Sequence, residues 1–116
     1  MGPYSPTRRV GDLLVCSGQI GIEAGPQGPA LVQGGLRPQT LQALANVKAL
    51  LESEGLDWAD VFKTTVYLAD IGYYAAFNEA YVEVLVDQRP ARSVVAVAGL
   101  PLGALVEIEA WAHVGN

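Results

Sequence analysis

The dominant feature of this sequence is an alternation over positions 106–114, where every second residue is apolar and three of the four residues between them are polar. Successive side chains of a β-strand point to opposite faces of the sheet, so this alternation predicts a strand with one buried face. The apolar face would hold Val106, Ile108, Ala110, Ala112 and Val114, and the opposite face Glu107, Glu109, Trp111 and His113. The carboxylates on the second face make it the candidate for chemistry.

A second strand is expected at residues 91–97, separated from the first by a turn rich in glycine and proline at residues 99–103. It begins with Arg92, a charged residue in an otherwise apolar run. The two helices predicted for this chain need only one face of a sheet, which leaves the other face uncovered. We expect Arg92, Glu107 and Trp111 to lie together on this uncovered face.

The remaining elements are short strands and two amphipathic helices. β-Branched and aromatic residues predict strands, and apolar residues at spacings of three and four predict helices. Strands are expected at residues 7–10, 13–16, 61–68 and briefly 30–32, and helices from Pro38 to a stop at Gly55 and over residues 73–85. This order predicts an α/β (α+β) domain with one mixed sheet and both helices packed on one face.

The composition favours a single domain that associates with copies of itself. Of the 116 residues, 51% are hydrophobic and only 16% are charged. A monomer of this size exposes a large share of its residues, so the apolar excess indicates a buried interface. Because the single Cys16 cannot form an internal disulfide and no targeting or membrane-length segment is apparent, we expect a cytoplasmic protein.

Charge and residue counts exclude several classes of function. A net charge of −5 disfavours binding to the phosphate backbone of nucleic acids. One histidine and one cysteine are too few for a zinc site, so no metal is expected. The sequence contains no glycine-rich phosphate loop with a lysine and no G-x-S-x-G motif.

Six segments of the sequence, taken together, resemble one known protein family, although no single segment is specific enough to identify it. They are GPYS (residues 2–5), SGQIG (17–21), NVKALLESEGLDWADVFKTTVYLAD (46–70), FNEAYVEV (77–84), PARSVVAVAGLP (90–101) and ALVEIEAWA (104–112). In this order they resemble the RidA/YjgF family of reactive-intermediate deaminases over almost the whole chain. The resemblance implies one RidA-like domain over residues 1–116, with a chorismate-mutase-like fold of the bacillus type. It also implies a homotrimer with inward-facing sheets and clefts between subunits, and no cofactor.

The same resemblance implies hydrolysis of reactive enamines and imines, such as 2-aminoacrylate and 2-iminopropanoate, to 2-keto acids and ammonia. The family's carboxylate-binding arginine falls on Arg92 and its water-positioning glutamate on Glu107. The implied substrate-binding residues are Tyr4, Ser17, Gly18, Asn78 and, through its backbone N–H, Val94. Many members have cysteine at the position of Val94. Proline is frequent at the position of Gly21, so glycine there is expected to loosen a cleft-lining loop at residues 21–33 that decides substrate size.

These residue types suit the implied chemistry. A planar guanidinium can bind a carboxylate through two hydrogen bonds. A carboxylate whose pKa is raised by burial can hold and deprotonate a water molecule. Without the resemblance, Arg92 beside Glu107 or Glu109 would more often be a structural ion pair, and Glu109 is expected to pair with a neighbouring group.

Other functions remain open. A non-catalytic trimer that binds small carboxylates such as 2-keto acids would also need Arg92, but it would tolerate Glu107→Gln. A chorismate-mutase-type enzyme would need further cations near Arg92, for which only Arg8, Arg9 and Lys63 are available. Family members are also linked to translation inhibition and RNA cleavage, which the net charge of −5 disfavours.

Overall fold

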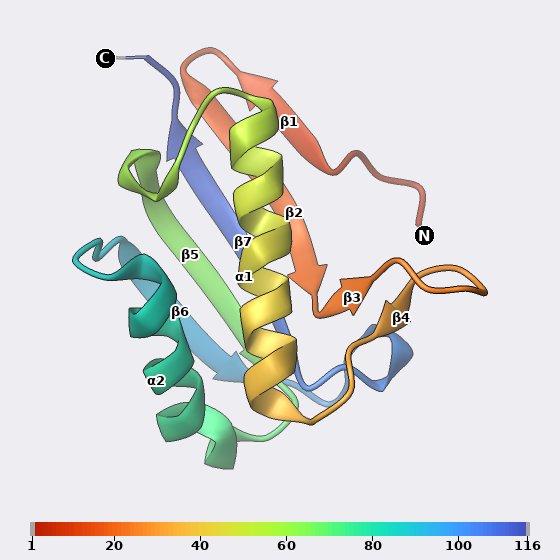
Figure 1. Cartoon of the computed structure of the whole chain (residues 1–116). Helices are drawn as coiled ribbons and strands as arrows, with labels where there is room; N and C mark the ends of the chain where they lie inside the picture. Colours follow the sequence, from red (N-terminus) through yellow and green to blue (C-terminus); the bar gives the residue numbers. More distant parts are fainter. Residues whose placement is uncertain (1, 116) are drawn as a thin grey trace.

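The computed structural model describes residues 2–115, which form a sheet with two helices on one face (Figure 1). The five-stranded sheet has the order β1 (Thr7–Val10), β2 (Leu13–Ile20), β7 (Val106–His113), β5 (Val61–Leu68) and β6 (Ala91–Ala96). All neighbours are antiparallel except β5 and β6, which are parallel. The sheet is therefore mixed, as the sequence predicts.

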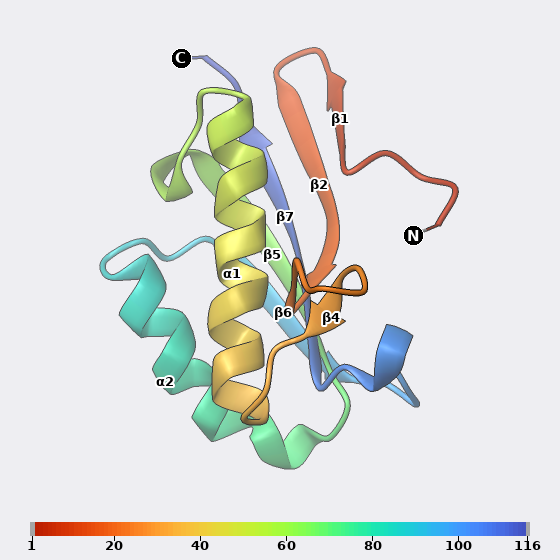
Figure 2. The ribbon, with the colours of Figure 1, turned by 45° about the vertical axis from the view of Figure 1, so that its right-hand side comes forward.

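Both helices lie on the same side of the sheet, which Figures 1 and 2 show from two directions. Helix α1 (Leu36–Ser53) packs across β2 and β7, and α2 (Tyr74–Leu85) makes the crossover that joins parallel β5 to β6. A small hairpin of β3 (Ile22–Glu23) and β4 (Ala30–Leu31) lies beside α1. Within residues 2–115, no helix combines the length and apolar character needed to cross a membrane.

The predicted apolar face of β7 forms the centre of the core. Its four side chains within the strand, Val106, Ile108, Ala110 and Ala112, are all 0% exposed. They pack against the apolar stripes of the helices, which include Leu44, Val47, Leu51, Phe77 and Tyr81. Burial of each large apolar side chain contributes about 1.5–3 kcal/mol to folding. The alternation read from the sequence therefore fixes which side of the sheet the helices cover.

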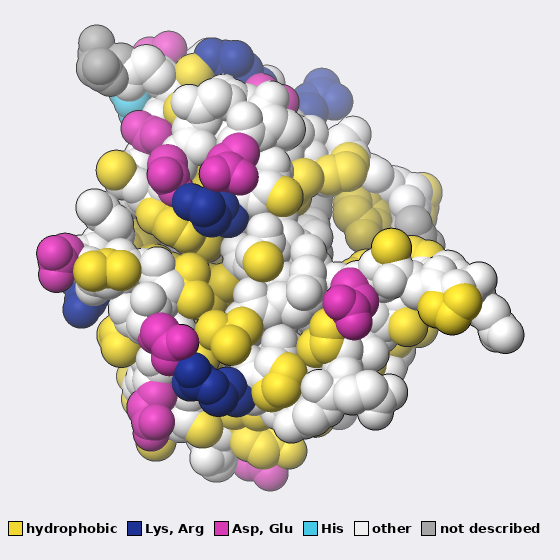
Figure 3. All heavy atoms as spheres, viewed as in Figure 1, with side chains coloured by type: hydrophobic (Ala, Val, Ile, Leu, Met, Phe, Trp, Pro, Cys, Tyr) yellow, Lys and Arg dark blue, Asp and Glu magenta, His cyan; other side chains and the backbone are white. Residues whose placement is uncertain are grey.

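The sheet face opposite the helices, here called the open face, keeps large apolar side chains in solvent. Val95, Phe62 and Trp111 are 44%, 42% and 40% exposed. On the helix-bearing side, by contrast, basic side chains lie next to acidic ones (Figure 3), and Lys48 Nζ is 3.0 Å from Asp57 Oδ1. The uncovered apolar surface of the described chain therefore includes the open face.

The larger differences from the prediction are at two element boundaries. Strand β2 runs on to Ile20, whereas the prediction ended it at Cys16, because a bulge after Cys16 allows its pairing with β7 to resume. Helix α1 begins at Leu36 and contains Pro38 in its first turn, where the missing N–H costs no helical hydrogen bond. Gly55 follows the helix with φ of 76°, which confirms the predicted stop.

The sheet register contradicts the prediction that Arg92 and Glu107 share a face. Arg92 lies opposite Thr64 of β5, whereas Glu107 lies opposite Tyr67. Thr64 and Tyr67 are an odd number of residues apart, so their side chains point to opposite faces. Arg92 therefore lies on the helix-covered face at the edge of the sheet, and Glu107 lies with Trp111 on the open face. Alternation assigns faces within one strand only, and the relation between strands depends on the register.

Candidate functional site

The first half of the candidate site is a pocket on the open face, lined by the N-terminal segment together with β2 and β7. This pocket, here called the Glu107 pocket, has a volume of about 340 Å³. Its lining residues are Tyr4, Val15, Ser17, Gly18, Pro101, Glu107 and Glu109. The structure thus brings together four of the residues that the sequence assigned to the site, namely Tyr4, Ser17, Gly18 and Glu107.

Gly18 determines where the Glu107 side chain can lie. A Cβ atom at residue 18 would lie 2.5 Å from Oε2 and 2.8 Å from Cδ of Glu107. Because glycine has no Cβ, the carboxylate can rest directly against the backbone of β2. The neighbouring β-bulge and the pairing of Ile20 with Glu107 hold the two strands in this arrangement.

Ser17 holds the segment that carries Tyr4. Its Oγ donates a hydrogen bond to the carbonyl oxygen of Ser5 at 2.6 Å, and its backbone N–H donates to Pro6 O at 2.8 Å. These bonds fix the irregular N-terminal segment along β2, which brings Tyr4 to the rim of the Glu107 pocket. The Ser17 hydroxyl therefore positions Tyr4 and leaves its oxygen lone pairs available as acceptors.

The two carboxylates of this pocket differ in their surroundings. Glu109 accepts a hydrogen bond from the Tyr67 hydroxyl at 3.1 Å, so its neighbour is a neutral donor rather than a cation. Burial raises the pKa of Glu107, and the nearby charge of Glu109 raises this pKa further. Among residues 2–115 no donor is hydrogen-bonded to Glu107. Glu107 is therefore the carboxylate that remains free for a water molecule or a ligand.

The second half of the candidate site surrounds Arg92 on the helix-covered side. The Arg92 pocket has a volume of about 240 Å³ and is lined by Asn78, Tyr81, Val82, Arg89, Pro90 and Arg92. The guanidinium carbon of Arg92 lies 4.9 Å from the ring centre of Tyr81, and Nη2 donates to the Tyr74 hydroxyl at 3.2 Å. Below it, the hydroxyls of Tyr81 and Thr64 share a buried hydrogen bond of 2.8 Å. Aromatic rings thus orient the cation.

Arg92 does not form the structural ion pair that would be the more common role of such a residue. No acidic side chain within the described range lies close enough to form a salt bridge with it. Nearby, Asn78 Oδ1 is buried without a hydrogen-bond partner among residues 2–115. An unsatisfied buried acceptor costs about 1–3 kcal/mol. Asn78 Oδ1 and the remaining donors of Arg92 therefore have no hydrogen-bond partner within the described residues.

Val94 also presents a free group at the edge of the sheet. Its side chain packs against the core, as do the other partly buried apolar side chains around it. The N–H of Val97 donates to Leu68 O across the β5–β6 pair. Because N–H groups alternate in direction along a strand, the N–H of Val94 points away from β5, toward the open edge. This direction fits the backbone role that the sequence assigned to Val94.

Arg89 and Gln39 are site residues that sequence reasoning missed. Arg89 lines the Arg92 pocket, which corrects the view that only Arg8, Arg9 and Lys63 could add a cation there. Its position three residues before Arg92 was an available signal. Gln39 is buried, and its Oε1 accepts from the N–H of Leu105 at 2.8 Å, which secures the start of β7 before Glu107. Nothing in the sequence distinguishes Gln39 from other polar helix residues.

The predicted place of the loop at residues 21–33 in a cleft between subunits stays a prediction, and its place within one chain is clear. It lies against α1 and lines neither the Glu107 pocket nor the Arg92 pocket. Nor does Gly21 serve simply to loosen it. A Cβ at residue 21 would lie 2.6 Å from the carbonyl oxygen of Gln39, so glycine permits close contact with the backbone of α1.

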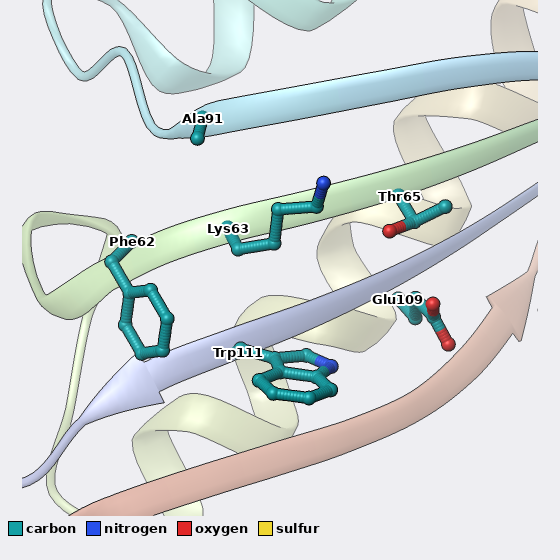
Figure 4. Close-up of a pocket in the computed structure, with 6 residues that line it drawn as sticks. All are labelled: Phe62, Lys63, Thr65, Ala91, Glu109 and Trp111. Atoms are coloured by element: carbon teal, nitrogen blue, oxygen red, sulfur yellow. The ribbon is translucent and has the colours of Figure 1, made fainter.

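A third pocket lies on the open face and shares Glu109 with the Glu107 pocket. It has a volume of about 350 Å³ and is lined by Phe62, Lys63, Thr65, Ala91, Glu109 and Trp111, all of which project from the strands on the side away from the helices (Figure 4). The rings of Phe62 and Trp111 meet edge to face, with centres 6.5 Å apart. Its aromatic lining is a surface that another protein chain could cover.

The folded chain therefore presents a carboxylate half-site and a guanidinium half-site on opposite faces of one sheet. Neither pocket by itself contains both a carboxylate and a guanidinium. Comparisons with known proteins identify the family to which the chain belongs. The family model described as Endoribonuclease L-PSP matches residues 1–114.

Similar proteins include an enzyme and a structure with a bound ligand. The human 2-iminobutanoate/2-iminopropanoate deaminase is 42% identical over 115 residues, which are 99% of this chain and 82% of that protein. A crystal structure from Thermotoga maritima is 43% identical, has a TM-score of 0.92 and covers 100% of this chain and 90% of its own. The structure of E. coli TdcF with bound serine is 34% identical, has a TM-score of 0.88 and covers 99% and 91% of the two chains. The chain belongs to the RidA/YjgF (Endoribonuclease L-PSP) family.

Proposed function

We propose that this protein hydrolyses reactive 2-imino acids and their enamine tautomers, of the 2-iminopropanoate and 2-aminoacrylate type, to 2-keto acids and ammonia. The site would be assembled from the Arg92 pocket of one copy and the Glu107 pocket of the next. The observation that supports this most directly is the complementarity of the two pockets. One contains a carboxylate with a raised pKa, and the other contains a guanidinium without an acidic partner among residues 2–115.

Substrate binding is assigned to the Arg92 half-site. The guanidinium of Arg92 would donate two hydrogen bonds to the substrate carboxylate, and the outward N–H of Val94 would add a third. Asn78, whose Oδ1 has no donor within the described chain, would bind the substrate nitrogen or its proton. Because the aromatic rings already orient Arg92, little rotamer entropy is lost on binding.

The reaction is assigned to the Glu107 half-site. Protonation at carbon converts the enamine into the imine, whose C=N bond is polarised by protonation at nitrogen. Glu107 accepts a proton from water as the water oxygen bonds to the imine carbon, and it returns a proton to the amine that leaves. The balance is one imine and one water in, one 2-keto acid and one ammonia out. Burial of Glu107 raises its pKa toward the working pH, which suits both transfers.

Assembly of this site requires an oligomer, for which we propose a homotrimer with inward-facing sheets. The exposed aromatic and aliphatic side chains of the open face, including Trp111, Phe62 and Val95, would be buried between copies. Burial of apolar surface contributes roughly 25 cal/mol per Å². A head-to-tail contact between different surfaces closes into a ring, and each contact in the ring would contain one complete site.

The first experiment measures ammonia and keto-acid release from freshly generated 2-iminopropanoate. Wild type is compared with Arg92→Ala, Glu107→Gln and the control Arg9→Gln, which changes an exposed arginine of β1. We expect both site variants to lose about 10²-fold or more in kcat/KM, and the control to match wild type. Rates that equal the uncatalysed reaction for wild type would refute the proposal.

The second experiment tests whether Arg92 and Glu107 act from different copies. The inactive variants Arg92→Ala and Glu107→Gln are mixed, unfolded and refolded together. In randomly mixed oligomers about a quarter of the sites receive an intact Arg92 and an intact Glu107, so about a quarter of wild-type activity should return. A site formed within one chain predicts no recovery, and this outcome would refute the shared site.

A second candidate function is a non-catalytic protein that binds small carboxylates. It is favoured by one specific observation, namely that the relative TdcF was solved with bound serine. Calorimetry with 2-oxobutanoate separates the two functions when combined with the rate assay. Binding by Glu107→Gln without turnover in wild type favours the binding protein, whereas turnover in wild type that Glu107→Gln loses favours the deaminase.

A further inference from the structure

The Arg92 pocket contains a second guanidinium, that of Arg89. Neither arginine forms a salt bridge with an acidic residue of the described range. Both lie close enough to the Tyr81 hydroxyl to lower its pKa, although burial of the ring has the larger, opposite effect. In a chain with a net charge of −5, two uncompensated cations beside one pocket make an unusual positive site.

Arg89 is fixed in place by the end of α2. Its Nη1 donates to the carbonyl oxygens of Val86, at 2.5 Å, and Gln88, at 2.8 Å. The carbonyl of Val86, the C-cap residue, lies at the C-terminal end of α2, where a positive charge is favourable, and that of Gln88 lies in the segment that follows. The guanidinium has five N–H donors in one plane. The donors on Nε and Nη2 have no hydrogen-bond acceptor in the part of the chain that the structure describes.

The size of the pocket admits more than a carboxylate group. Its volume of about 240 Å³ is roughly eight times the 30 Å³ that a water molecule occupies in the liquid. A substrate whose α-carboxylate binds Arg92 would extend its side chain along this pocket. Arg89, which lines the same pocket, would then be available to an acidic group on a short side chain.

We propose that Arg89 is a specificity-determining residue that binds a second carboxylate, so that the site accepts the 2-imino derivatives of acidic amino acids. This inference rests on the proposed deaminase function. 2-Imino acids arise from amino acids, and the acidic group that amino-acid side chains provide is a carboxylate, which matches the planar fork of arginine. The reaction remains a hydrolysis, in which 2-iminoglutarate and water give 2-oxoglutarate and ammonia.

The test compares two substrates in the same protein. 2-Iminoglutarate and 2-iminopropanoate are generated in place by amino-acid oxidases from glutamate and alanine, and kcat/KM is measured for each. We expect Arg89→Gln to lower the ratio of these constants, 2-iminoglutarate over 2-iminopropanoate, by about ten-fold or more. Arg89→Lys, which keeps the charge but loses the planar fork, should give an intermediate ratio. The control Arg9→Gln should leave the ratio at the wild-type value.

A binding measurement separates failure of this inference from failure of the proposed function. Calorimetry gives the affinities of 2-oxoglutarate and 2-oxobutanoate for the wild type and Arg89→Gln, whether or not either imine is hydrolysed. If wild type hydrolyses neither imine, the deaminase function is wrong, and a selective loss of 2-oxoglutarate affinity in Arg89→Gln would still support a second carboxylate site. An unchanged substrate ratio and unchanged relative affinities would overturn the inference. If Arg89→Gln lowers the Tm but leaves the substrate ratio and the relative affinities unchanged, Arg89 serves only to cap the end of α2.

Discussion

Replacing Gly18 by alanine should separate activity from stability. In the structure the new Cβ would lie 2.5 Å from Oε2 of Glu107, whereas ordinary van der Waals contact begins at 3.4 Å. The carboxylate must therefore move by about 0.9 Å. Misplacement of a catalytic group by about 1 Å costs on the order of 10²-fold in rate. We expect kcat/KM for 2-iminopropanoate to fall by about this factor.

The same substitution should leave the fold intact. The atoms that obstruct the new Cβ belong to the end of a flexible glutamate side chain, and Gly18 does not adopt a left-handed backbone conformation. Glycine in a strand is less stable than alanine by roughly 0.5–1 kcal/mol. The free energy of unfolding should consequently stay the same or rise slightly.

The assay measures kcat/KM and the urea midpoint for wild type, Gly18→Ala and Gly99→Ala. Gly99 is a matched control, because a Cβ there would meet no atom within 4 Å and its backbone φ is not left-handed. Near-wild-type activity of Gly18→Ala would show that the reaction does not use the observed position of Glu107. If Gly18→Ala loses more than about 2 kcal/mol in the free energy of unfolding, the Glu107 side chain cannot move aside to accommodate the new Cβ.

Three further substitutions test other contacts of the site. Gly21→Ala should lower the free energy of unfolding by about 1–3 kcal/mol, because its Cβ would lie 2.6 Å from the backbone carbonyl of Gln39; an unchanged urea midpoint would contradict this. Glu109→Gln removes a charge that raises the pKa of Glu107. The base acts when it is ionised, so activity rises with pH through this pKa. The acidic limb of the pH–rate profile should therefore move to lower pH in the variant. A shift to higher pH would show that the charge of Glu109 does not raise the pKa of Glu107. Ser17→Ala removes the bond to Ser5 O, so proteolysis of residues 2–6 should accelerate and KM should rise; unchanged cleavage would mean that this bond does not hold the segment.

Much of the fold can be predicted from local patterns. The alternation in β7 correctly assigns Val106 and Ile108 to the core and Glu107 to the other face. The helical stripe and Gly55 correctly give the body and the end of α1. These predictions succeed because they depend on the period of one element and on its own burial, which a single segment of sequence contains.

The boundaries of helices and strands are harder to predict from the sequence. The extension of β2 to Ile20 depends on a bulge that lets the strand resume pairing with β7, and such a bulge has no required residue type. The partly buried hydrogen bond between Gln39 and Leu105 joins residues far apart in the chain. Both depend on what a distant segment offers, so a local pattern does not contain them.

Local patterns in the sequence are enough to give the α+β class, the two faces of each strand and the types of residue from which a site could be built. That Arg92 and Glu107 stand on opposite faces follows from the folded structure alone, because the register of β6 and β7 against β5 sets the relation between strands. It also decided that Gly18 gives Glu107 its place and that Arg89 joins Arg92 in one pocket. Side-chain period is a property of one strand, whereas the meeting of two side chains depends on how separate elements are aligned.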